Sequence, residues 1–417
     1  MAEKVTIKKK HIVMYIGSLN KGGAERVMCN LAEYFYGIGY KVTLATTYLS
    51  DDEYELPHAA WKVLKSEDDE NAVKVLNPDE ELRYVDLKGG EPMGIGRIFT
   101  ALMPYEKGNR AQNFHRRIEK LTNAWERLKP DIILSFLGKN NVMALQSALS
   151  LDIPVVVSVR ATPSEEYATL GLKAAVKVLF PAAAGVVVQT TGAMDFFGPL
   201  IRNKCRVLPN AINEEFMAHN VVPFEDRKKV IVSVGRLDDN KNQKVIINAF
   251  SYFVKKHADY RLMIYGDGPT RDLLERLCGK LEILDETGKG ADGKVTFMGS
   301  VDRIADRICE SEIFVLTSKT EGMPNALIEA MSLGLCCIST DCPCGGPADL
   351  IKNGRNGILI PMDSDVKMAT NIFHALERLA DDPAIARKMG GAALSVREEY
   401  NPDSVNAKWK EYFEELM

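Results

Sequence analysis

Short apolar runs alternate with helix-like segments along the chain, and this alternation starts a second time near the middle of the sequence. Strand-like runs lie at residues 11–16, 41–46, 131–136, 154–159 and 185–189, and again at 230–234, 261–265, 295–298, 313–316, 335–339 and 357–360. Runs of this length that are rich in Val and Ile are typical of parallel strands buried on both faces. We therefore predict an α/β chain with two doubly wound, Rossmann-like parallel sheets.

The length of the chain supports the same division. With 417 residues, 46% of them hydrophobic, the sequence exceeds what a single ordinary core takes up. The pattern restarts around residues 207–213. The predicted domains are residues 1–209 and 210–400, and we expect them to face each other across a cleft.

Charge excludes one class of function. The net charge is −4 with 26% charged residues, which is not the composition of a protein that binds nucleic acid through a basic surface. Up to residue 209 there are 27 basic and 24 acidic residues, and after it 26 basic and 33 acidic. The first domain is therefore the more cationic one.

Part of that positive charge falls in residues 107–129, where Phe114, Ile118, Leu121 and Trp125 recur at helical spacing among seven Lys and Arg residues. The pattern predicts a basic amphipathic helix. Two interpretations remain open, a surface helix packed on its own sheet or a contact with an anionic membrane. No apolar run reaches the 18 residues of a membrane span, so we expect a cytoplasmic protein, with a peripheral place on the inner membrane face as the alternative.

The eight cysteines do not form the pattern of a secreted disulfide framework, and we expect reduced thiols. Cys342 and Cys344 are separated by one residue, which is not the usual zinc spacing. We therefore expect no metal and no cofactor.

A Gly-rich stretch, residues 17–23, follows the first predicted strand and precedes a predicted helix at 24–38. Free backbone N–H groups at such a helix start can bind an anion. Gly22 and Gly23 equally suit a turn that binds nothing, and the stretch lacks a full G-x-G-x-x-G pattern.

In the second domain, ligands of an open α/β sheet should lie at the loops that follow the strands, namely residues 235–242, 266–269, 299–302 and 318–324. The last of these leads into TEGMPNALIEAMSLG, which carries Glu321 and Glu329 in an apolar context. Pro324 suits the first helical position and Gly322 an unusual backbone conformation, so the N–H groups of the next residues are predicted to face an anion.

Both glutamates suit a sugar nucleotide. A helical side chain tilts toward the helix N-terminus, so Glu329 is predicted to point back at the ligand and to accept from a vicinal diol such as a ribose. Glu321 is placed to accept from another hydroxyl group. The alternative for Glu329 is an ion pair or a surface position.

Arg236 and Lys241 flank the loop after the first strand of the same domain. Two cations near a helix start suit a diphosphate, although each alone is also compatible with a solvated loop cation. Together with the two glutamates they indicate a nucleotide diphosphate bearing a sugar.

These residues resemble a known family, the retaining glycosyltransferases of family 4, the "glycosyl transferases group 1", which have the GT-B fold. The motifs, in order, are Gly22-Gly-Ala-Glu-Arg26, Ser233-Val-Gly-Arg-Leu237 with Lys241-Asn-Gln243, Tyr265-Gly-Asp-Gly-Pro269, the E-x₇-E segment Glu321 to Glu329, and Asp341-Cys-Pro-Cys-Gly-Gly-Pro347. The resemblance runs close to the full chain and is strongest to the bacterial members that build capsular or lipid-linked glycans.

The resemblance implies roles for individual residues. Arg236, Lys241 and Glu321 are the catalytic candidates. The implied donor-binding set is Gly22, Gly23, Arg236, Lys241, Gly299, Glu321, Gly322, Met323, Asn325, Ala326, Leu327 and Glu329. Many members carry a His after the strand at 155–159, where this chain has Arg160, which we assign to the acceptor side or the sugar, a structural salt bridge being the alternative. Residues 401–417 are expected to form a helix that packs back on the first domain.

The implied activity is metal-independent transfer, with retention, of a hexose or N-acetylhexosamine from a nucleotide diphosphate sugar, most plausibly a UDP-sugar. The implied acceptor is a hydroxyl of a glycan, with a polyprenyl-diphosphate-linked glycan favoured over a soluble one. Two alternatives stay open, a non-catalytic sugar-nucleotide-binding partner of a glycan assembly complex and another GT-B enzyme such as a UDP-sugar 2-epimerase.

Overall fold

The computed structural model describes residues 9–49, 52–60, 94–102, 106–284 and 294–417. The chain forms two compact units. Unit 1 comprises Met1–Val188, Met194–Leu208 and Asn406–Met417, and unit 2 comprises Gln189–Ala193 and Pro209–Val405. Each unit is described by itself below.

Unit 1 contains a parallel sheet that, in the described part of the chain, has seven strands in the order β3-β2-β1-β4-β5-β6-β7. Its strands are β1 (His11–Ile16), β2 (Lys41–Thr46), β3 (Gly96–Phe99), β4 (Ile132–Phe136), β5 (Val155–Ser158), β6 (Gly185–Val188) and β7 (Cys205–Val207). In β1 all six residues are buried, as the continuous apolar run predicted.

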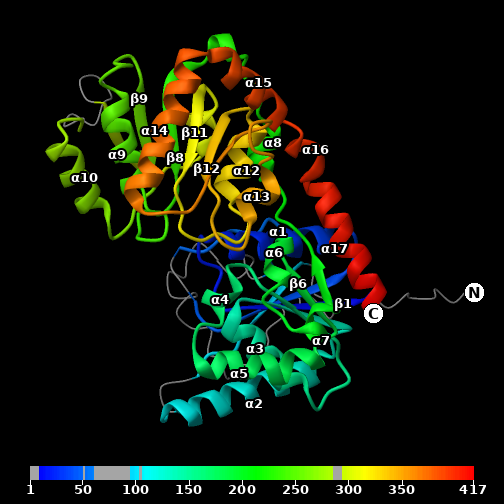
Figure 1. The fold of residues 1–417 in the computed structure, drawn as a ribbon. Helices are drawn as coiled ribbons and strands as arrows, with labels where there is room; N and C mark the ends of the chain where they lie inside the picture. Colours follow the sequence, from blue (N-terminus) through cyan, green and yellow to red (C-terminus); the bar gives the residue numbers. More distant parts are fainter. Residues whose placement is uncertain (1–8, 50–51, 61–93, 103–105, 285–293) are drawn as a thin grey trace, which may run out of the picture. The chain divides into compact units, whose positions relative to one another are not determined.

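Helices cover both faces of this sheet (Figure 1). They are α1 (Gly23–Gly37), α2 (Arg110–Leu128), α3 (Gly138–Ala148), α4 (Pro163–Glu166), α5 (Leu170–Leu179), the 3-10 turn η3 (Phe180–Ala182) and α7 (Pro199–Arg202). Helix α6 (Thr191–Met194) falls mostly in the segment Gln189–Ala193, which belongs to unit 2. Helix α2 is the predicted basic helix; it starts at a capping box formed by Asn109 and Gln112 and ends at Lys129, which has a left-handed conformation. Helix α3 packs against both α2 and α5.

The end of α17 (Pro402–Leu416) belongs to unit 1. Phe413 stacks on Phe35 of α1 with 5.1 Å between ring centroids, and Trp409 lies 6.3 Å from Phe136 at the end of β4. Gly185 makes room for this helix, because a Cβ there would collide with the hydroxyl of Tyr412. The aromatic face of α17 is thus part of the unit 1 core.

Unit 2 contains a second parallel sheet, with six strands among the described residues in the order β10-β9-β8-β11-β12-β13. They are β8 (Lys228–Val234), β9 (Arg261–Tyr265), β10 (Val295–Gly299), β11 (Ser311–Leu316), β12 (Cys336–Thr340) and β13 (Ile358–Ile360). The helices are α8 (Glu214–Ala218), η4 (Phe224–Asp226), α9 (Lys244–Phe253), α10 (Arg271–Lys280), α11 (Ile304–Ile308), α12 (Asn325–Ser332), α13 (Gly346–Leu350), α14 (Asp365–Asp381), α15 (Pro383–Ala393) and α16 (Val396–Glu399).

Successive side chains of the unit 2 strands enter different cores. Ile313 of β11 belongs to the core that contains α9 and α14, while its neighbour Phe314 belongs to the core that contains α12. In the next strand, β12, Cys336 and Cys337 divide in the same way. The sheet is therefore covered on both faces, which confirms the predicted α/β, doubly wound architecture.

Two local expectations were wrong. Pro324 is not the first helical residue but the N-cap of α12, which begins at Asn325. Gly322 is not among the glycines with positive φ.

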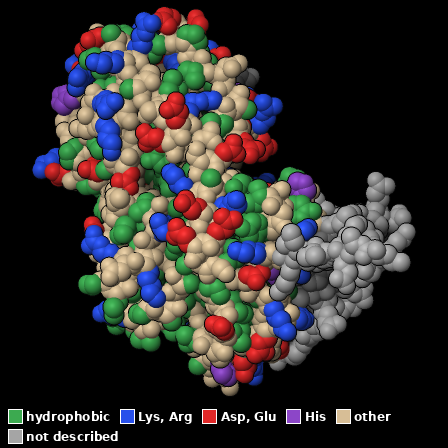
Figure 2. Space-filling model, turned by 90° about the vertical axis from the view of Figure 1, so that its right-hand side faces the viewer, with side chains coloured by type: hydrophobic (Ala, Val, Ile, Leu, Met, Phe, Trp, Pro, Cys, Tyr) green, Lys and Arg blue, Asp and Glu red, His purple; other side chains and the backbone are tan. Residues whose placement is uncertain are grey.

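Three general features of the structure relate to what the sequence predicted about cysteines, surface charge and membrane spans. All eight cysteines lie in the described part of the chain and are free thiols. On the face drawn in Figure 2, basic and acidic side chains are intermixed among the coloured residues. Among the helices that the structure describes, none has both the length and the apolar character that crossing a bilayer requires.

Candidate functional site

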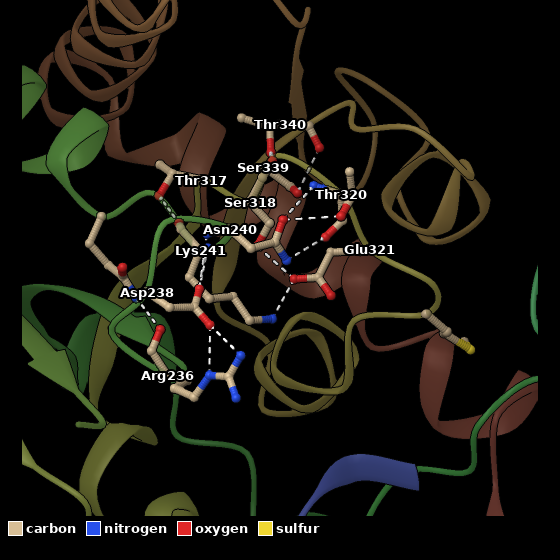
Figure 3. Close-up of polar contacts among 12 residues, drawn as sticks. Arg236, Asp238, Asn240, Lys241, Thr317, Ser318, Thr320, Glu321, Ser339 and Thr340 are labelled. Carbon is tan, nitrogen blue, oxygen red and sulfur yellow. Dashed lines mark hydrogen bonds and ion pairs between the residues drawn. The ribbon is translucent and has the colours of Figure 1, made fainter. Parts of the chain in front are cut away.

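The loops that follow β8 and β11 in unit 2 lie against each other at the carboxyl ends of these neighbouring strands. Asn240 ties them together. Its backbone oxygen accepts from the N–H of Lys319 at 2.8 Å, while its side chain accepts from the N–H of Thr320 and donates to the oxygen of Thr320, both at 3.1 Å (Figure 3). Residues 80 positions apart in the sequence thus form one surface.

Lys241 and Glu321 meet on this surface. The Lys241 Nζ lies 2.5 Å from Glu321 Oε1, and the hydroxyl of Ser318 donates to the same oxygen at 2.6 Å (Figure 3). The side chains are 25% and 12% exposed, so this ion pair is partly shielded from water but open to a ligand. A charge-assisted contact of this kind holds both groups in defined positions.

Arg236 is held differently. Its guanidinium contacts Asp238 Oδ2 at 2.6 Å, yet its side chain is 74% exposed, whereas Asp238 is 14% exposed. The other oxygen of Asp238 accepts from the N–H of Asn240 at 3.0 Å and of Lys241 at 2.9 Å, which is an Asx turn. Burial acts against the charge of Asp238, but the Lys241 N–H and the Arg236 guanidinium together hold the pKa of Asp238 below its usual value.

Glycines bring the neighbouring loops together. Three glycines with positive φ lie at the ends of neighbouring strands. Gly235 follows β8, Gly266 follows β9, and Gly299 is the last residue of β10. The N–H of Gly266 donates to the oxygen of Gly299 at 2.8 Å, and a Cβ at Gly266 would collide with the oxygen of Gly235. Side chains are excluded here because backbone packs on backbone.

The N-terminus of α12 completes the arrangement. The first helical bonds run from Leu327 and Ile328 to the oxygen of Pro324, so the N–H groups of Asn325 and Ala326 precede the helical hydrogen-bond ladder. The oxygen of Gly322 is approached by Gly346, where a Cβ would collide with it. The start of α13 thus packs closely on the backbone just before α12.

A buried chain of amides anchors the loop before α12. Gln189 Oε1 accepts from the N–H of Met323 at 3.2 Å, and Gln189 Nε2 donates to Asn210 Oδ1 at 2.9 Å. Asn210 Nδ2 in turn donates to Asn325 Oδ1 at 2.6 Å. Gln189 and Asn210 are 5% and 3% exposed, so both fix this loop from inside unit 2.

Glu329 lies four residues beyond the first residue of α12 and is 6% exposed. Leu327 is fully buried and Met323 nearly so, whereas Ala326 is partly exposed. The structure therefore places the predicted residues 321–329 and the pair Arg236 and Lys241 on adjoining loops and one helix of unit 2.

The remaining predicted residues belong to unit 1. Gly22 is the N-cap of α1 with an extended backbone, and Gly23 is the first residue of that helix. Arg160 follows β5, is 8% exposed, and lies with its guanidinium carbon 4.7 Å from the centre of the Phe136 ring. Burial lowers the pKa of Arg160 to about 10, although Glu166 opposes that shift.

Sequence reasoning missed Asp238, Asn240 and Ser318. The stretch from Asp238 to Asn240 directly after a strand is a signal for an Asx turn, and it could have indicated that the Lys241 N–H is fixed. Ser318 has no such local signal, because its role depends on the pairing of β11 with β8.

The chain is similar in sequence to known glycosyltransferases. Residues 228–378 match the family "Glycosyl transferases group 1". The chain is 24% identical over 413 residues to the GalNAc-α-(1→4)-GalNAc-α-(1→3)-diNAcBac-PP-undecaprenol α-1,4-N-acetyl-D-galactosaminyltransferase of Campylobacter jejuni, with 97% of this chain and 98% of the relative covered.

A second Campylobacter jejuni protein, N-acetylgalactosamine-N,N'-diacetylbacillosaminyl-diphospho-undecaprenol 4-α-N-acetylgalactosaminyltransferase, is 26% identical over 392 residues, covering 90% of this chain and 91% of the relative. Among solved structures, Anabaena HepE in complex with UDP and glucose superposes with a TM-score of 0.71 at 16% identity, over 97% of this chain and 100% of that chain. Residues 228–378 thus carry the sequence pattern of the glycosyl transferases group 1 family, and the chain has the GT-B-like fold of the solved glycosyltransferase structures it matches.

Proposed function

We propose that the protein is a retaining glycosyltransferase that moves a hexose or N-acetylhexosamine from a UDP-sugar to a hydroxyl of a lipid-linked glycan. The observation that carries this proposal is the cluster of Lys241, Glu321 and Ser318 at the carboxyl ends of β8 and β11. A cation and a hydroxyl-binding carboxylate stand there side by side, next to the N-terminus of α12, which suits a sugar attached to a diphosphate.

Each charged group has a proposed task. Arg236 and Lys241 neutralise the donor diphosphate, Glu329 accepts hydrogen bonds from the ribose, and Glu321 accepts from hydroxyls of the sugar. Of residues 322–327, the N–H groups of Gly322, Asn325 and Ala326 contact the phosphate or the sugar, because Pro324 has no N–H and those of Met323 and Leu327 already bond to Gln189 and Pro324. Lys241 and Glu321 lie 2.5 Å apart, so one compact pair offers a cation to the phosphate and a carboxylate to the sugar.

The chemistry follows from where charge develops. In transfer with retention, the acceptor hydroxyl attacks the anomeric carbon from the face that the diphosphate leaves, and negative charge grows on the leaving oxygen. Removing one well-placed donor to such a charge typically costs about 3 kcal/mol in the barrier. Arg236 and Lys241 also bind the ground-state diphosphate, so only the gain in their contacts at the transition state accelerates transfer. With two cations at the diphosphate, the proposal requires no metal.

The donor and acceptor classes draw support from the relatives. HepE was solved with UDP and glucose, and the names of both Campylobacter jejuni relatives give a glycan on diphospho-undecaprenol as acceptor. We extend these substrate classes to the present chain as part of the proposal.

The test is nucleotide release from a panel of UDP-, GDP- and ADP-sugars, with and without a polyprenyl-diphosphate-linked glycan, in the presence of EDTA. We expect one donor to be used, and Lys241→Ala and Glu329→Ala each to lower turnover at least about 100-fold, because each loses a contact to a charged or strongly polar donor group. Lys244→Ala is the matched control. Lys244 lies three residues after Lys241 and makes a half-exposed ion pair with Asp365.

Other outcomes would select the alternatives. Tight sugar-nucleotide binding without turnover of any donor, with or without acceptor, would identify a non-catalytic partner. Conversion of a UDP-sugar to its 2-epimer without an acceptor would identify an epimerase. Loss of activity in EDTA would overturn the metal-independent mechanism, and an inverted anomeric configuration in the product would overturn retention.

A further inference from the structure

A polar cluster lies in unit 1 at the carboxyl ends of β4 and β5, centred on Glu166, a residue of intermediate exposure whose Oε2 atom is buried. Glu166 Oε1 accepts from the backbone N–H groups of Arg160 and of Ala161, both at 2.6 Å. The Arg160 guanidinium stacks over Phe136 and donates to the hydroxyl of Ser158 at 3.5 Å. Glu166 therefore fixes the turn that contains Arg160, and it does so by hydrogen bonds to the backbone of that turn.

The two oxygens of Glu166 are in unequal surroundings. Oε1 has two short hydrogen bonds, whereas Oε2 is buried and has no hydrogen-bond partner among the described residues. Burial raises the pKa of Glu166 to about 7, although the N–H groups of Ala161 and Arg160 and the charge of Arg160 oppose this shift. Both protonation states of this carboxyl are thus populated near neutral pH.

Among the residues that the structure describes, the charged or titratable groups facing Glu166 are Arg160 and Tyr167. The Tyr167 hydroxyl accepts from Asn141 Nδ2 at 3.0 Å, and burial together with Glu166 raises the pKa of Tyr167 well above its usual value, so it stays neutral. Arg160, with a pKa of about 10, stays charged. Glu166 is then the group of this cluster whose charge changes between pH 6 and pH 8.

The backbone next to this cluster is constrained. Leu137, between β4 and α3, has φ +76° and ψ 144°, a conformation that is costly for a residue with a branched side chain. At the following residue, Gly138, a Cβ would lie 2.7 Å from the backbone oxygen of Glu166. Strain of this kind persists where the surrounding structure imposes it, and here it lies beside the close approach of Gly138 to the backbone of Glu166.

We propose that Glu166 is a positioning residue, whose ionised carboxylate fixes the 160–162 turn and with it Arg160, so that acceptor use becomes dependent on pH around neutrality. This inference rests on the proposed transferase function and deepens it by assigning a control over its acceptor side. Protonation weakens the two N–H···O bonds and removes the negative charge that faces Arg160. Acceptor use therefore falls as pH falls through about 7.

The test compares wild type with Glu166→Gln, which resembles the protonated carboxyl in shape and charge, between pH 6 and pH 8.5. Transfer to acceptor and the affinity for the donor nucleotide are measured separately. At pH 8 we expect kcat/KM for the acceptor to be about tenfold lower in the variant, since a hydrogen bond to a charged group has become a neutral one. At pH 6 the two proteins should agree, and nucleotide affinity should be the same at every pH.

Agreement at pH 6 with divergence at pH 8 cannot arise from a misfolded variant. The matched control is Glu165→Gln, which changes the adjacent, exposed residue and should leave the pH profile unchanged. A Glu166→Gln profile that parallels wild type, or one that is lowered equally at both pH values, overturns the proposal while transfer itself stands. Absence of transfer by wild type with every donor overturns the proposed function, and this inference with it.

Discussion

At the scale of single residues, the site is defined by how its charges are compensated. Lys241 has Glu321 as its partner, and Arg236 has Asp238, but the two pairs differ in exposure. The side chain of Arg236 is 74% exposed and can leave Asp238 at little cost, because exposed ion pairs contribute at most about 1 kcal/mol. Lys241 is more constrained, so it defines the site geometry while Arg236 is the cation that can move to a ligand.

Glu166 should also make the stability of unit 1 depend on pH. Its folded pKa of about 7 lies above its ordinary value of 4.5, so between these values the folded state binds more protons than the unfolded state. Stability then falls as pH rises from about 4.5 to about 7. The difference in unfolding free energy between Glu166→Gln and wild type should shift in favour of the variant by up to roughly 3 kcal/mol across this window.

Urea denaturation at pH 5 and at pH 8 checks this prediction. The sign is the informative part, because a paired surface carboxylate gives the opposite trend. A wild-type protein that gained stability relative to the variant on going to pH 8 would contradict the raised pKa.

At the scale of elements, the loops of unit 2 are arranged by contacts between backbones. Gly266 packs on Gly235, and Gly346 packs on the oxygen of Gly322 at the start of α12. These contacts set how closely the loops after β8, β9, β11 and β12 can converge. A site built in this way presents backbone N–H groups to a ligand at fixed positions, which favours recognition of phosphate.

Gly346→Ala should therefore weaken donor binding more than it unfolds the protein. The added Cβ collides with the Gly322 oxygen and must push the loop before α12 outward. We expect at least about a tenfold loss in nucleotide affinity, the effect of misplacing one charge-assisted hydrogen bond. Calorimetric titration with UDP measures it. Gly391→Ala, in α15, meets nothing within 4 Å and should leave the affinity unchanged, so an equal loss there would refute the steric argument.

The comparison of elements shows what a single sequence reveals. Strands β1, β2 and β9 begin and end at the predicted residues. In β1 and β9 a polar first residue leads into an apolar run, whereas β2 mixes apolar residues with Lys41, Thr43 and Thr46. Strands β3 and β7 were not predicted. They are edge strands of three or four residues whose hydrogen-bonded neighbour, rather than their own composition, makes them strands.

The candidate site divides in a similar way. Arg236, Lys241, Glu321 and Glu329 were predicted from residue type and position after a strand. Two contacts were not predicted, namely the pairing of Lys241 with Glu321 and the anchoring of the 322–325 segment by Gln189 and Asn210. Both depend on contacts between residues that are 80 or more positions apart. Long-range contacts of this kind are set by sheet order, which local patterns do not specify.

At the scale of the whole molecule, unit 1 carries a surface suited to an anionic amphiphile. A pocket of about 950 Å³ is lined by residues of α2, α3 and α5, including Arg110, Arg117 and Lys139 beside Phe114. On α5, Leu170 and Val178 are 86% and 73% exposed, with two lysines between them. Exposed apolar side chains among cations are typical of helices that lie in a membrane interface.

We therefore predict that the protein binds vesicles containing phosphatidylglycerol and releases them as salt is raised, with little binding to phosphatidylcholine alone. The double substitution Leu170→Asp and Val178→Asp should lower vesicle binding at least about tenfold, because it places two acids among the lysines of this surface and removes the apolar contact. Co-sedimentation measures it. Leu200→Asp, at a 75% exposed leucine of α7, is the control, and equal loss there would show that the binding is not specific to α5.

The discontinuity of unit 1 also has a consequence for synthesis. Trp409 and Phe413, which complete the core against Phe136 and Phe35, are translated only after the 197 residues of Pro209–Val405. At a translation rate of about 5–20 residues per second, Phe35 of α1 and Phe136 of β4 lack the aromatic side chains of α17 for roughly 10–40 seconds on the ribosome. Unit 2, apart from Gln189–Ala193, is contiguous and can fold as it emerges, so the unit whose synthesis begins first is the one that finishes folding last.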